Sequence, residues 1–302
     1  MADVTLHKKK VDPSESIQSF TDIHIQLHCC RYWMLTEWEC TNLDFPFWRI
    51  YHNGIEGASI LYKGVLTELT PDKIVIIPPN TSFYNCLKSD IYNITRESIS
   101  GRSIESVLDL EKLEGNKKVD HLFIHFNLGL PYDFIQPGIY SVDVNVSTAP
   151  LIEALKKKCI DNSISFDFKT CLHIHNLIIY LLSNIPNDIW QNGEMDQRII
   201  KCMQCIQKNT HERHTNESLA SMANMATNSF ARLFKTNTGE SVQQYILKRR
   251  IEKACILLHH SNESIDNIAH ECGFCDRYHF SKAFKQILSM SPGYYKKHLT
   301  FK

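Results

Sequence analysis

The last hundred residues of the chain contain one sequence pattern twice, and this duplication limits what they can fold into. Leu219-Ala220 recurs as Ile268-Ala269 forty-nine residues later, and Phe230 recurs as Phe280 at a distance of fifty. The other pairs at fifty are Arg232 with Lys282, Phe234-Lys235 with Phe284-Lys285, Gly239 with Ser289, Ser241 with Ser291, and Tyr245 with Tyr295. One residue inserted after Gly273 explains the change of offset. The region is therefore predicted to hold two copies of one structural unit.

Each copy has the pattern of two helices joined by a tight turn. Thr215 or Ser264 can cap the first helix by accepting a hydrogen bond from an unpaired backbone N–H. A small side chain, Ala220 or Ala269, lets the second helix cross closely over the first. In the second copy, Gly273 supplies a turn that a larger side chain would strain. Both copies are thus predicted to be helix-turn-helix units.

The second helix of each unit has one polar stripe that is not expected to pack against the core. Apolar positions pin the opposite stripe, and the polar stripes are Thr227, Asn228, Ala231, Arg232 and Lys235 in the first copy, and Arg277, Tyr278, Ser281, Lys282 and Lys285 in the second. Arg and Lys can donate to guanine, and Asn can pair with adenine in the major groove. The alternative is that both stripes are only solvated helix faces. Two copies in tandem favour the DNA-binding interpretation.

A long helix is predicted between the copies, over residues 243–258, with Lys248-Arg249-Arg250 across its middle. Such a rod could hold two recognition helices roughly 34 Å apart, which is one DNA turn. One monomer would then read two successive major grooves.

The charge of the chain is segregated. The formal net charge is zero, but residues 195–302 hold sixteen Lys and Arg against nine Asp and Glu, a net +7. The remaining residues hold seventeen basic and twenty-four acidic side chains, a net −7. A basic carboxy-terminal third is expected of a region that contacts phosphates.

These residues together resemble the signature of the AraC/XylS transcriptional regulators over about residues 195–300. The resemblance rests on Leu219-Ala220, Phe234-Lys235, Gly239, Arg250, Ala254, Leu257-Leu258, Ile268-Ala269, Cys272-Gly273-Phe274, Tyr278, Phe280, Ser281, Phe284-Lys285 and Ser291-Pro292. It implies that Asn228, Ala231 and Arg232, and in the second copy Arg277, Tyr278, Ser281 and Lys282, face bases. It also implies that backbone N–H groups at the starts of these helices meet phosphates.

Three positions depart from the family pattern. Asn224 stands where the first copy often has Gly, and Asn tolerates a left-handed backbone. Ala226 replaces the usual Ser at the start of the first recognition helix, which removes a cap worth about 1 kcal/mol. Ser289 stands where Gly is common. Ala226 and Ala231 weaken the case for base readout by the first copy, so the second copy is expected to dominate specificity.

The first half of the chain has a different character. Residues from about 32 to 146 are predicted to be β-rich, with hairpin turns at Asn53-Gly54 and Lys63-Gly64. Residues 90–119 are polar and irregular, and one short helix is expected there. The predicted fold class is α+β and multidomain: a β-rich barrel, a helical linker and an all-α domain of two helix-turn-helix units. The predicted domains are 1–150, 151–193 and 194–302. The resemblance implies a cupin-like sensor domain, of the type found in Bacteroidetes members, for the first.

An effector pocket is predicted from a concentration of aromatic side chains. Trp33, Trp38, Phe47, Trp48 and Tyr51 lie within twenty residues, and such rings line sites for sugars and other small molecules. The alternative is that they fill the core of the barrel.

No metal site and no cofactor are predicted. His121 and His125 share a strand face, but Pro78-Pro79-Asn80-Thr81 lacks the histidine that cupin enzymes usually place after it. The eleven cysteines are expected to be inert thiols, including the pairs Cys202/Cys205 and Cys272/Cys275 with metal-like spacing. No nucleophile-elbow, P-loop, dinucleotide-binding or zinc-protease motif is present. The chain is therefore not expected to be an enzyme.

The sequence thus favours a transcription regulator that binds double-stranded DNA. We expect an activator that contacts RNA polymerase, responds to a small-molecule effector such as a sugar, and forms a homodimer through helices in 151–183. The amino terminus has lysines but no apolar run after them, so a cytoplasmic location without membrane contact is expected. Two alternatives stay open: a constitutive DNA-binding and dimerisation module, and a cupin-type enzyme fused to a DNA-binding tail.

Overall fold

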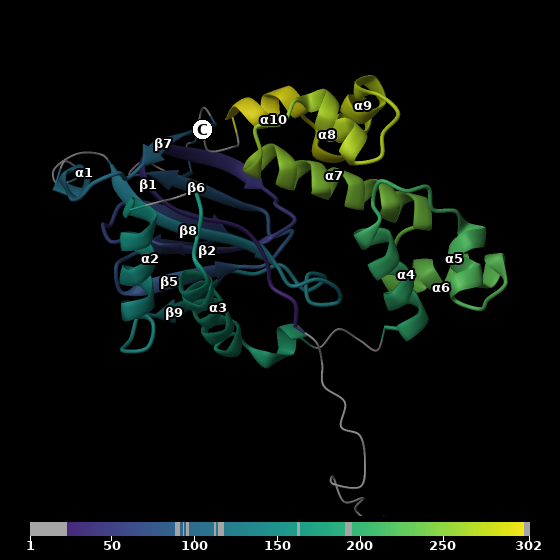
Figure 1. Ribbon diagram of the computed structural model, residues 1–302, viewed down its shortest axis with the longest axis horizontal. Helices are drawn as coiled ribbons and strands as arrows, with labels where there is room; N and C mark the ends of the chain where they lie inside the picture. The colour runs from purple at the N-terminus through teal and green to yellow at the C-terminus, as the bar shows by residue number, and fades with distance from the viewer. Residues whose placement is uncertain are drawn as a thin grey trace, which may run out of the picture.

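The first half of the chain forms one curled antiparallel sheet, a half-barrel (Figure 1). The computed structural model describes residues 23–87, 91–92, 94, 97–111, 113, 118–161, 164–190 and 195–298. Within these residues, nine strands form the sheet in the order β4-β3-β6-β1-β8-β2-β5-β9, and β7 also pairs with β1. Their bounds are β1 Gln26–Leu43, β2 Trp48–His52, β3 Ala58–Tyr62, β4 Val65–Leu69, β5 Lys73–Ile77, β6 Phe83–Leu87, β7 Ser98–Ser103, β8 Val119–Asn127 and β9 Tyr140–Asp143.

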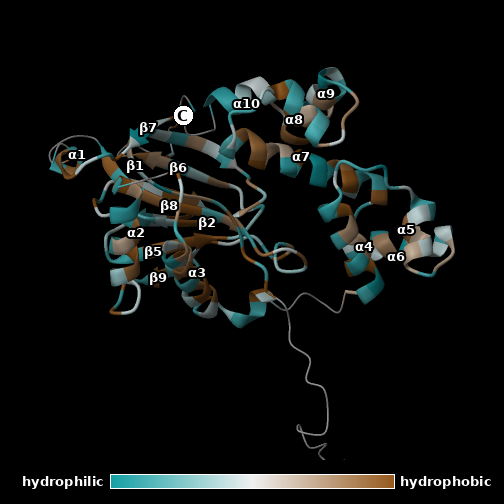
Figure 2. Cartoon of the chain, viewed as in Figure 1, coloured by the Kyte–Doolittle hydropathy of each residue, from teal (hydrophilic) through white to brown (hydrophobic). Residues whose placement is uncertain are grey.

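The sheet buries apolar side chains on both of its faces. Strand β8 is buried at every position, so its residues alternate between two separate cores. Leu122, Ile124 and Phe126 point to the outer face, which is covered by α2 (Ala149–Asp161) and α3 (Phe168–Ser183). Phe123 points into the half-barrel, toward β3 and β6. Figure 2 shows this as hydrophobic colour along β2, β5 and β8.

Two turn predictions had opposite outcomes. The hairpin at Lys63-Gly64 is confirmed: both residues have positive φ, and Tyr62 pairs with Val65 across the turn. The hairpin at Asn53-Gly54 was wrong, because β2 pairs with β5 and β8 rather than with β3. Gly54 is needed for close approach instead, since a Cβ there would lie 2.7 Å from Asp120 Oδ2.

The polar stretch 90–119 is more regular than predicted. It contains the expected short helix, α1 (Val107–Glu111), but also the strand β7. Strand β7 lies along the middle of β1, where Trp38 pairs with Ile99, so its polar sequence is tolerated at a half-exposed edge. The sheet also begins earlier than predicted, at Gln26.

The rest of the chain is helical. After the short helix η2 (Asn187–Trp190), the helices are α4 Gln197–Lys208, α5 Asn216–Met222, α6 Thr227–Thr238, α7 Val242–His260, α8 Ile265–Glu271, α9 Arg277–Leu288 and α10 Pro292–His298. The last strand thus ends at Asp143, and α2, the next helix, begins at Ala149. The predicted boundary at 193 and the amino-terminal lysines lie outside the described residues.

The sheet and the helical region share two apolar clusters. Phe45 and Phe47, from the segment directly before β2, pack in one cluster with side chains of α7, α8, α9 and α10. Leu130, after β8, packs in the other with α4, α5, α6 and α7. Helix α7 therefore joins both halves of the molecule, as its position in Figure 1 indicates. Within the described ranges, no helix is both long and apolar enough to cross a bilayer.

Candidate DNA-binding interface

The first helix-turn-helix unit consists of α5, a turn and α6. Thr215 caps α5 as predicted, and Ser218 completes a reciprocal capping box with it. Asn224 takes the left-handed conformation that the turn requires, with φ of 52°. Ala226 occupies the N-cap position before α6 and makes no side-chain cap hydrogen bond, as the sequence predicts. The first recognition helix therefore begins on backbone N–H groups that no cap covers.

The second unit, α8, a turn and α9, has better-satisfied ends. Ser264 caps α8 by accepting from the Asn267 backbone N–H at 3.1 Å. Gly273 has φ of +80°, and a Cβ on it would lie 2.7 Å from the carbonyl oxygen of His211. Asp276 caps α9 by accepting from His279 N at 2.8 Å. This cap was missed, although an Asp directly before the helical pattern is the usual signal.

Both recognition helices are fixed by a pair of phenylalanines. Phe230 and Phe234 are fully buried under α6, and Phe280 and Phe284 are fully buried under α9. The edge of each pair meets a tyrosine: Tyr245 lies 5.4 Å from Phe234, and Tyr295 lies 5.4 Å from Phe284, between ring centroids. The predicted duplication is thus also a duplication of the core. It fixes which stripe of each helix faces outward.

The predicted polar stripes do face outward. The exposed members are Asn228, Arg232 and Lys235 on α6 and Arg277, Tyr278, Lys282 and Lys285 on α9, while Thr227, Ala231 and Ser281 are half-buried. Tyr278 is 74% exposed. Arg277 makes an ion pair with Asp266 at 3.1 Å, and because both groups are exposed this contact is weak. Its guanidinium can therefore exchange partners for a base or a phosphate.

Helix α7 separates the two units and one arginine ties them together. Its nineteen residues span about 28 Å at 1.5 Å per residue. Arg250 donates from Nε to the carbonyl of Thr210 at 3.0 Å, and from Nη2 to that of Glu212 at 2.9 Å, both before α5. Its Nη1 donates to the carbonyl of Gly273 at 2.8 Å, in the turn of the second unit. The planar fork of one side chain thus sets the spacing of the two units.

The aromatic residues predicted to bind an effector are mostly core residues. Trp38, Phe47, Trp48 and Tyr51 are almost completely buried, and Trp48 donates from Nε1 to Asp133 at 3.0 Å. Trp33 is also buried, but it borders a pocket of about 740 Å³ between β1, α3 and the end of α7. A second pocket of about 520 Å³ lies between the sheet and α7.

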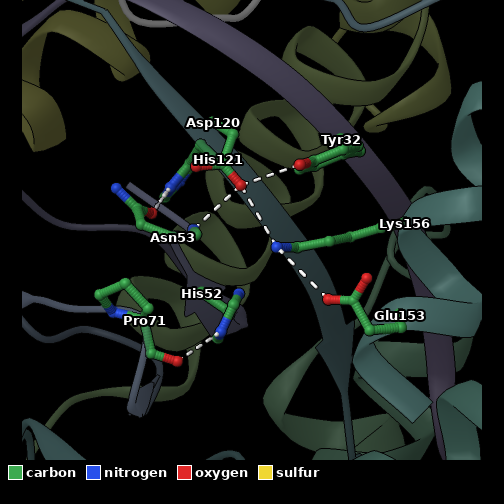
Figure 3. A network of polar contacts seen from close by, with 9 residues as sticks. Tyr32, His52, Asn53, Pro71, Asp120, His121, Glu153 and Lys156 are labelled. Carbon is green, nitrogen blue, oxygen red and sulfur yellow. Dashed lines mark hydrogen bonds and ion pairs between the residues drawn. The ribbon is translucent and has the colours of Figure 1, made fainter. Parts of the chain in front are cut away.

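A buried polar network ties α2 to the sheet (Figure 3). Oδ2 of Asp120 accepts from the Tyr32 hydroxyl at 2.8 Å and from Gly54 N at 2.9 Å, and it lies 3.3 Å from Lys156 Nζ. His121 contacts Asn53 at 2.7 Å. Burial lowers the pKa of His121 to about 3, so this imidazole is neutral at physiological pH. The network pairs the charges that it buries, which suits a structural support.

Comparison with known proteins places the helical region in a family. The sequence model of a helix-turn-helix domain matches residues 219–298. An AraC-like transcription regulator of Streptomyces lividans is 26% identical over 180 residues, covering 59% of this chain and 56% of the relative. The transcriptional activator RhaS of an Enterobacter strain is 34% identical over 97 residues, covering 32% and 35%. The raffinose operon regulator RafR of Pediococcus pentosaceus is 32% identical over 150 residues, covering 49% and 54%.

The chain thus spans between about a third and a little over half the length of these curated relatives. A crystal structure of ToxT from Vibrio cholerae matches nearly the whole fold, with a TM-score of 0.51, 11% identity, and coverage of 92% of this chain and 97% of that one. At this identity the likeness concerns the fold alone. The duplicated helix-turn-helix units and the matching domain sequence make the helical region similar to that of AraC-like transcription regulators.

Proposed function

We propose that the protein is a sequence-specific DNA-binding regulator of transcription in which one chain reads two successive major grooves. The observation that carries the proposal is the pair of outward polar stripes on α6 and α9, each fixed by buried phenylalanines and held at opposite ends of α7. The net +7 charge of residues 195–302 supports phosphate contact. The bases are expected to be read chiefly by Arg277, Tyr278 and Lys282, with Ser281 in close approach, and on α6 by Asn228 and Arg232.

The test is selection of the full-length protein on a pool of randomised duplexes at two salt concentrations, with sequencing of the retained DNA. The expected result is one asymmetric motif with two half-sites about one helical turn apart. Binding that is sensitive to salt but selects no motif would leave phosphate contact alone and would contradict the proposal.

We further propose that the first domain modulates this binding and that the regulator is an activator that contacts RNA polymerase. Support for modulation comes from the two pockets, since each is lined by residues of both the sheet and α7 or its end. A small molecule bound there, such as a sugar, would change the orientation of the first domain relative to the helix-turn-helix units. Titration of sugars against DNA affinity distinguishes this from a constitutive module, in which affinity stays constant. A cupin-type enzyme is the less favoured alternative, because the relatives are regulators.

A homodimer through α3 is the remaining part of the proposal. Phe168, Leu172 and Ile179 are 79%, 51% and 54% exposed, and they follow one stripe of this helix. Three large apolar side chains on one exposed stripe are typical of a helix that meets a partner. Sedimentation of the wild type and of Leu172→Glu tests this. We expect a dimer that the variant converts to monomer, whereas a wild-type monomer at micromolar concentration would contradict it.

A further inference from the structure

Three side chains with metal-binding atoms meet where the sheet contacts the end of α7. Cys29 lies on β1, His125 on β8, and His260 is the last residue of α7. One ligand atom from each lies within 4.8 Å of the other two. Cys29 and His125 are cross-strand partners in the β1–β8 ladder, which places their side chains on the same face of the sheet. The imidazole of His260 lies edge-on to that of His125, with 5.3 Å between ring centroids.

The two histidines lack the partners that buried imidazoles normally have. Among the described residues, neither ring nitrogen of His125 nor of His260 has a hydrogen-bond partner. His125 is only 2% exposed, and aromatic rings surround it, with Phe47 at 4.7 Å and Phe123 at 5.2 Å. Burying polar groups without hydrogen bonds costs stability, and each such group in a folded protein needs a reason. A bound cation would use these unpaired nitrogens.

We propose that Cys29, His125 and His260 form a Zn²⁺ site that joins the sensor sheet to the DNA-binding domain. Thiolate and imidazole are the ligands that zinc prefers, and one Cys with two His is a donor set for a borderline-soft cation. Tetrahedral coordination needs ligand atoms about 3.5 Å apart, so a small contraction of the present cluster would enclose the ion.

The two imidazoles are in the state that binds a metal, whereas the thiol has to lose its proton. Burial lowers the pKa of His260 to about 2 and that of His125 well below its usual value, so both imidazoles are neutral and each offers a lone pair. Burial raises the pKa of Cys29 to about 12, which keeps the thiol protonated without an ion. Zinc binding therefore displaces one proton from Sγ, which leaves with the solvent as the thiolate bonds to the metal.

The site also has an entrance and a fourth coordination position. Cys29, His260 and the neighbouring His28 line the pocket of about 740 Å³ next to β1. A water molecule from this pocket could complete the tetrahedron. Arg49, the cross-strand partner of His125 on β2, adds positive charge nearby, and the Cys29 thiolate offsets one of the two charges that the ion brings.

A metal here would connect the sheet to the helices that hold the two helix-turn-helix units. Two ligands belong to the sheet and the third ends the helix that carries both recognition helices. Zinc would therefore fix the angle between the sensor domain and the DNA-binding domain. This consequence rests on the proposed function, whereas the metal site itself does not.

The test is titration of the reduced full-length protein with Co²⁺. This ion substitutes for Zn²⁺ in zinc sites and shows a charge-transfer absorption band when a thiolate is one of its ligands. We expect one equivalent to bind with a thiolate-to-cobalt band and d–d bands of tetrahedral strength, and Zn²⁺ to displace it. Cys29→Ser should abolish the thiolate band, and His260→Gln should weaken binding at least tenfold. Circular dichroism and a thermal melt of each variant verify that it folds.

Two matched controls come from the chain. Cys171→Ser removes another thiol that lines the same pocket, and Cys275→Ser breaks an exposed group formed by Cys275, Asp276 and His279. Both should retain the band. Absence of a thiolate band in the wild type, its survival in Cys29→Ser, or its loss only in Cys275→Ser would overturn the proposal. No DNA is present in this titration, so its outcome is independent of whether the protein binds an operator.

Discussion

The two helix-turn-helix units share a core but differ at the turn and at the start of the recognition helix. The second unit has Gly273 in its left-handed turn and Asp276 as the cap of α9. The first has Asn224 at the equivalent turn and the uncapped Ala226 before α6. Both differences leave the first unit with the weaker local structure. The duplicated phenylalanines show that packing, rather than turn chemistry, holds the two units to one shape.

The outward stripes differ in the same direction. The second unit presents Arg277 and Tyr278 in its first turn, two long side chains with hydrogen-bonding tips. The first presents Thr227 and Asn228, which are short. Long donors reach base edges more readily, whereas an uncapped helix start offers backbone N–H groups to a phosphate. The second unit is thus suited to read sequence and the first to fix position on the duplex.

The largest expected effect is the loss of the arginine that ties the units together. Arg250→Ala removes three hydrogen bonds from a charged donor to carbonyls of both units, so we expect a loss of about 3–4 kcal/mol in the free energy of unfolding. Urea denaturation followed by circular dichroism measures it. Arg250→Lys keeps the charge but cannot reach three carbonyls, so its loss should be intermediate. Equal stability of the wild type and Arg250→Ala would mean that α7 alone couples the units.

The turns provide a direct comparison. Gly273→Ala forces a Cβ against the carbonyl of His211 and into left-handed backbone, so a loss of about 2–3 kcal/mol is expected. Asn224→Ala changes the first turn at φ of 52° and should lose about 1 kcal/mol, because only the backbone preference changes. The same denaturation experiment ranks them. A larger loss of stability in Asn224→Ala than in Gly273→Ala would show that the first turn, and not the second, depends more on its residue type.

Replacing one arginine in each stripe tests the division of labour. Arg277→Ala should relax base preference at one operator position and weaken specific binding by about 1–3 kcal/mol. Arg232→Ala, in the stripe of α6, should relax base preference less than Arg277→Ala and weaken binding more evenly across sequences. Selection on randomised duplexes with each variant distinguishes these outcomes. Uniform weakening by Arg277→Ala would show that its guanidinium contacts phosphate rather than a base.

The helical region was predictable from sequence because its determinants are local and occur twice. Thr215 and Ser264 cap backbone N–H groups only three residues away. A glycine at position 273 is by itself a signal for the left-handed backbone that the turn adopts. The buried phenylalanines recur at one spacing, so the outward stripes followed from periodicity alone. The cap of α9 by Asp276 was not predicted. The equivalent position of the first copy is Ala226, so comparing the two copies does not reveal this cap.

The sheet in the first half of the chain was less predictable because strand pairing is set by distant residues. Asn53-Gly54 has the sequence of a hairpin, but β2 finds its partners at β5 and β8, and Gly54 serves the approach to Asp120. Aromatic composition could not distinguish a pocket from a core. The meeting of Cys29, His125 and His260 depends on one strand register and on the docking of α7, neither of which leaves a sequence spacing to detect.

The smallest expected effect tests the helix starts by exchanging them. Asp276→Ala should lose about 1 kcal/mol of stability by removing the cap of α9, and Ala226→Asp should gain a similar amount by capping α6. The gain in stability should come with weaker DNA binding, because the new carboxylate would occupy the N–H groups proposed to meet a phosphate and would repel that phosphate.

Thermal melts and DNA affinity at one salt concentration measure both effects, and Ala226→Ser serves as the matched control because it caps α6 without adding charge. Ala226→Ser should stabilise the protein with a smaller loss of affinity than Ala226→Asp. If Ala226→Asp bound DNA as tightly as the wild type, the start of α6 would lie away from the backbone of the duplex. The first unit would then have to be positioned by its outward stripe, through Arg232 and Lys235, rather than by its uncapped helix end.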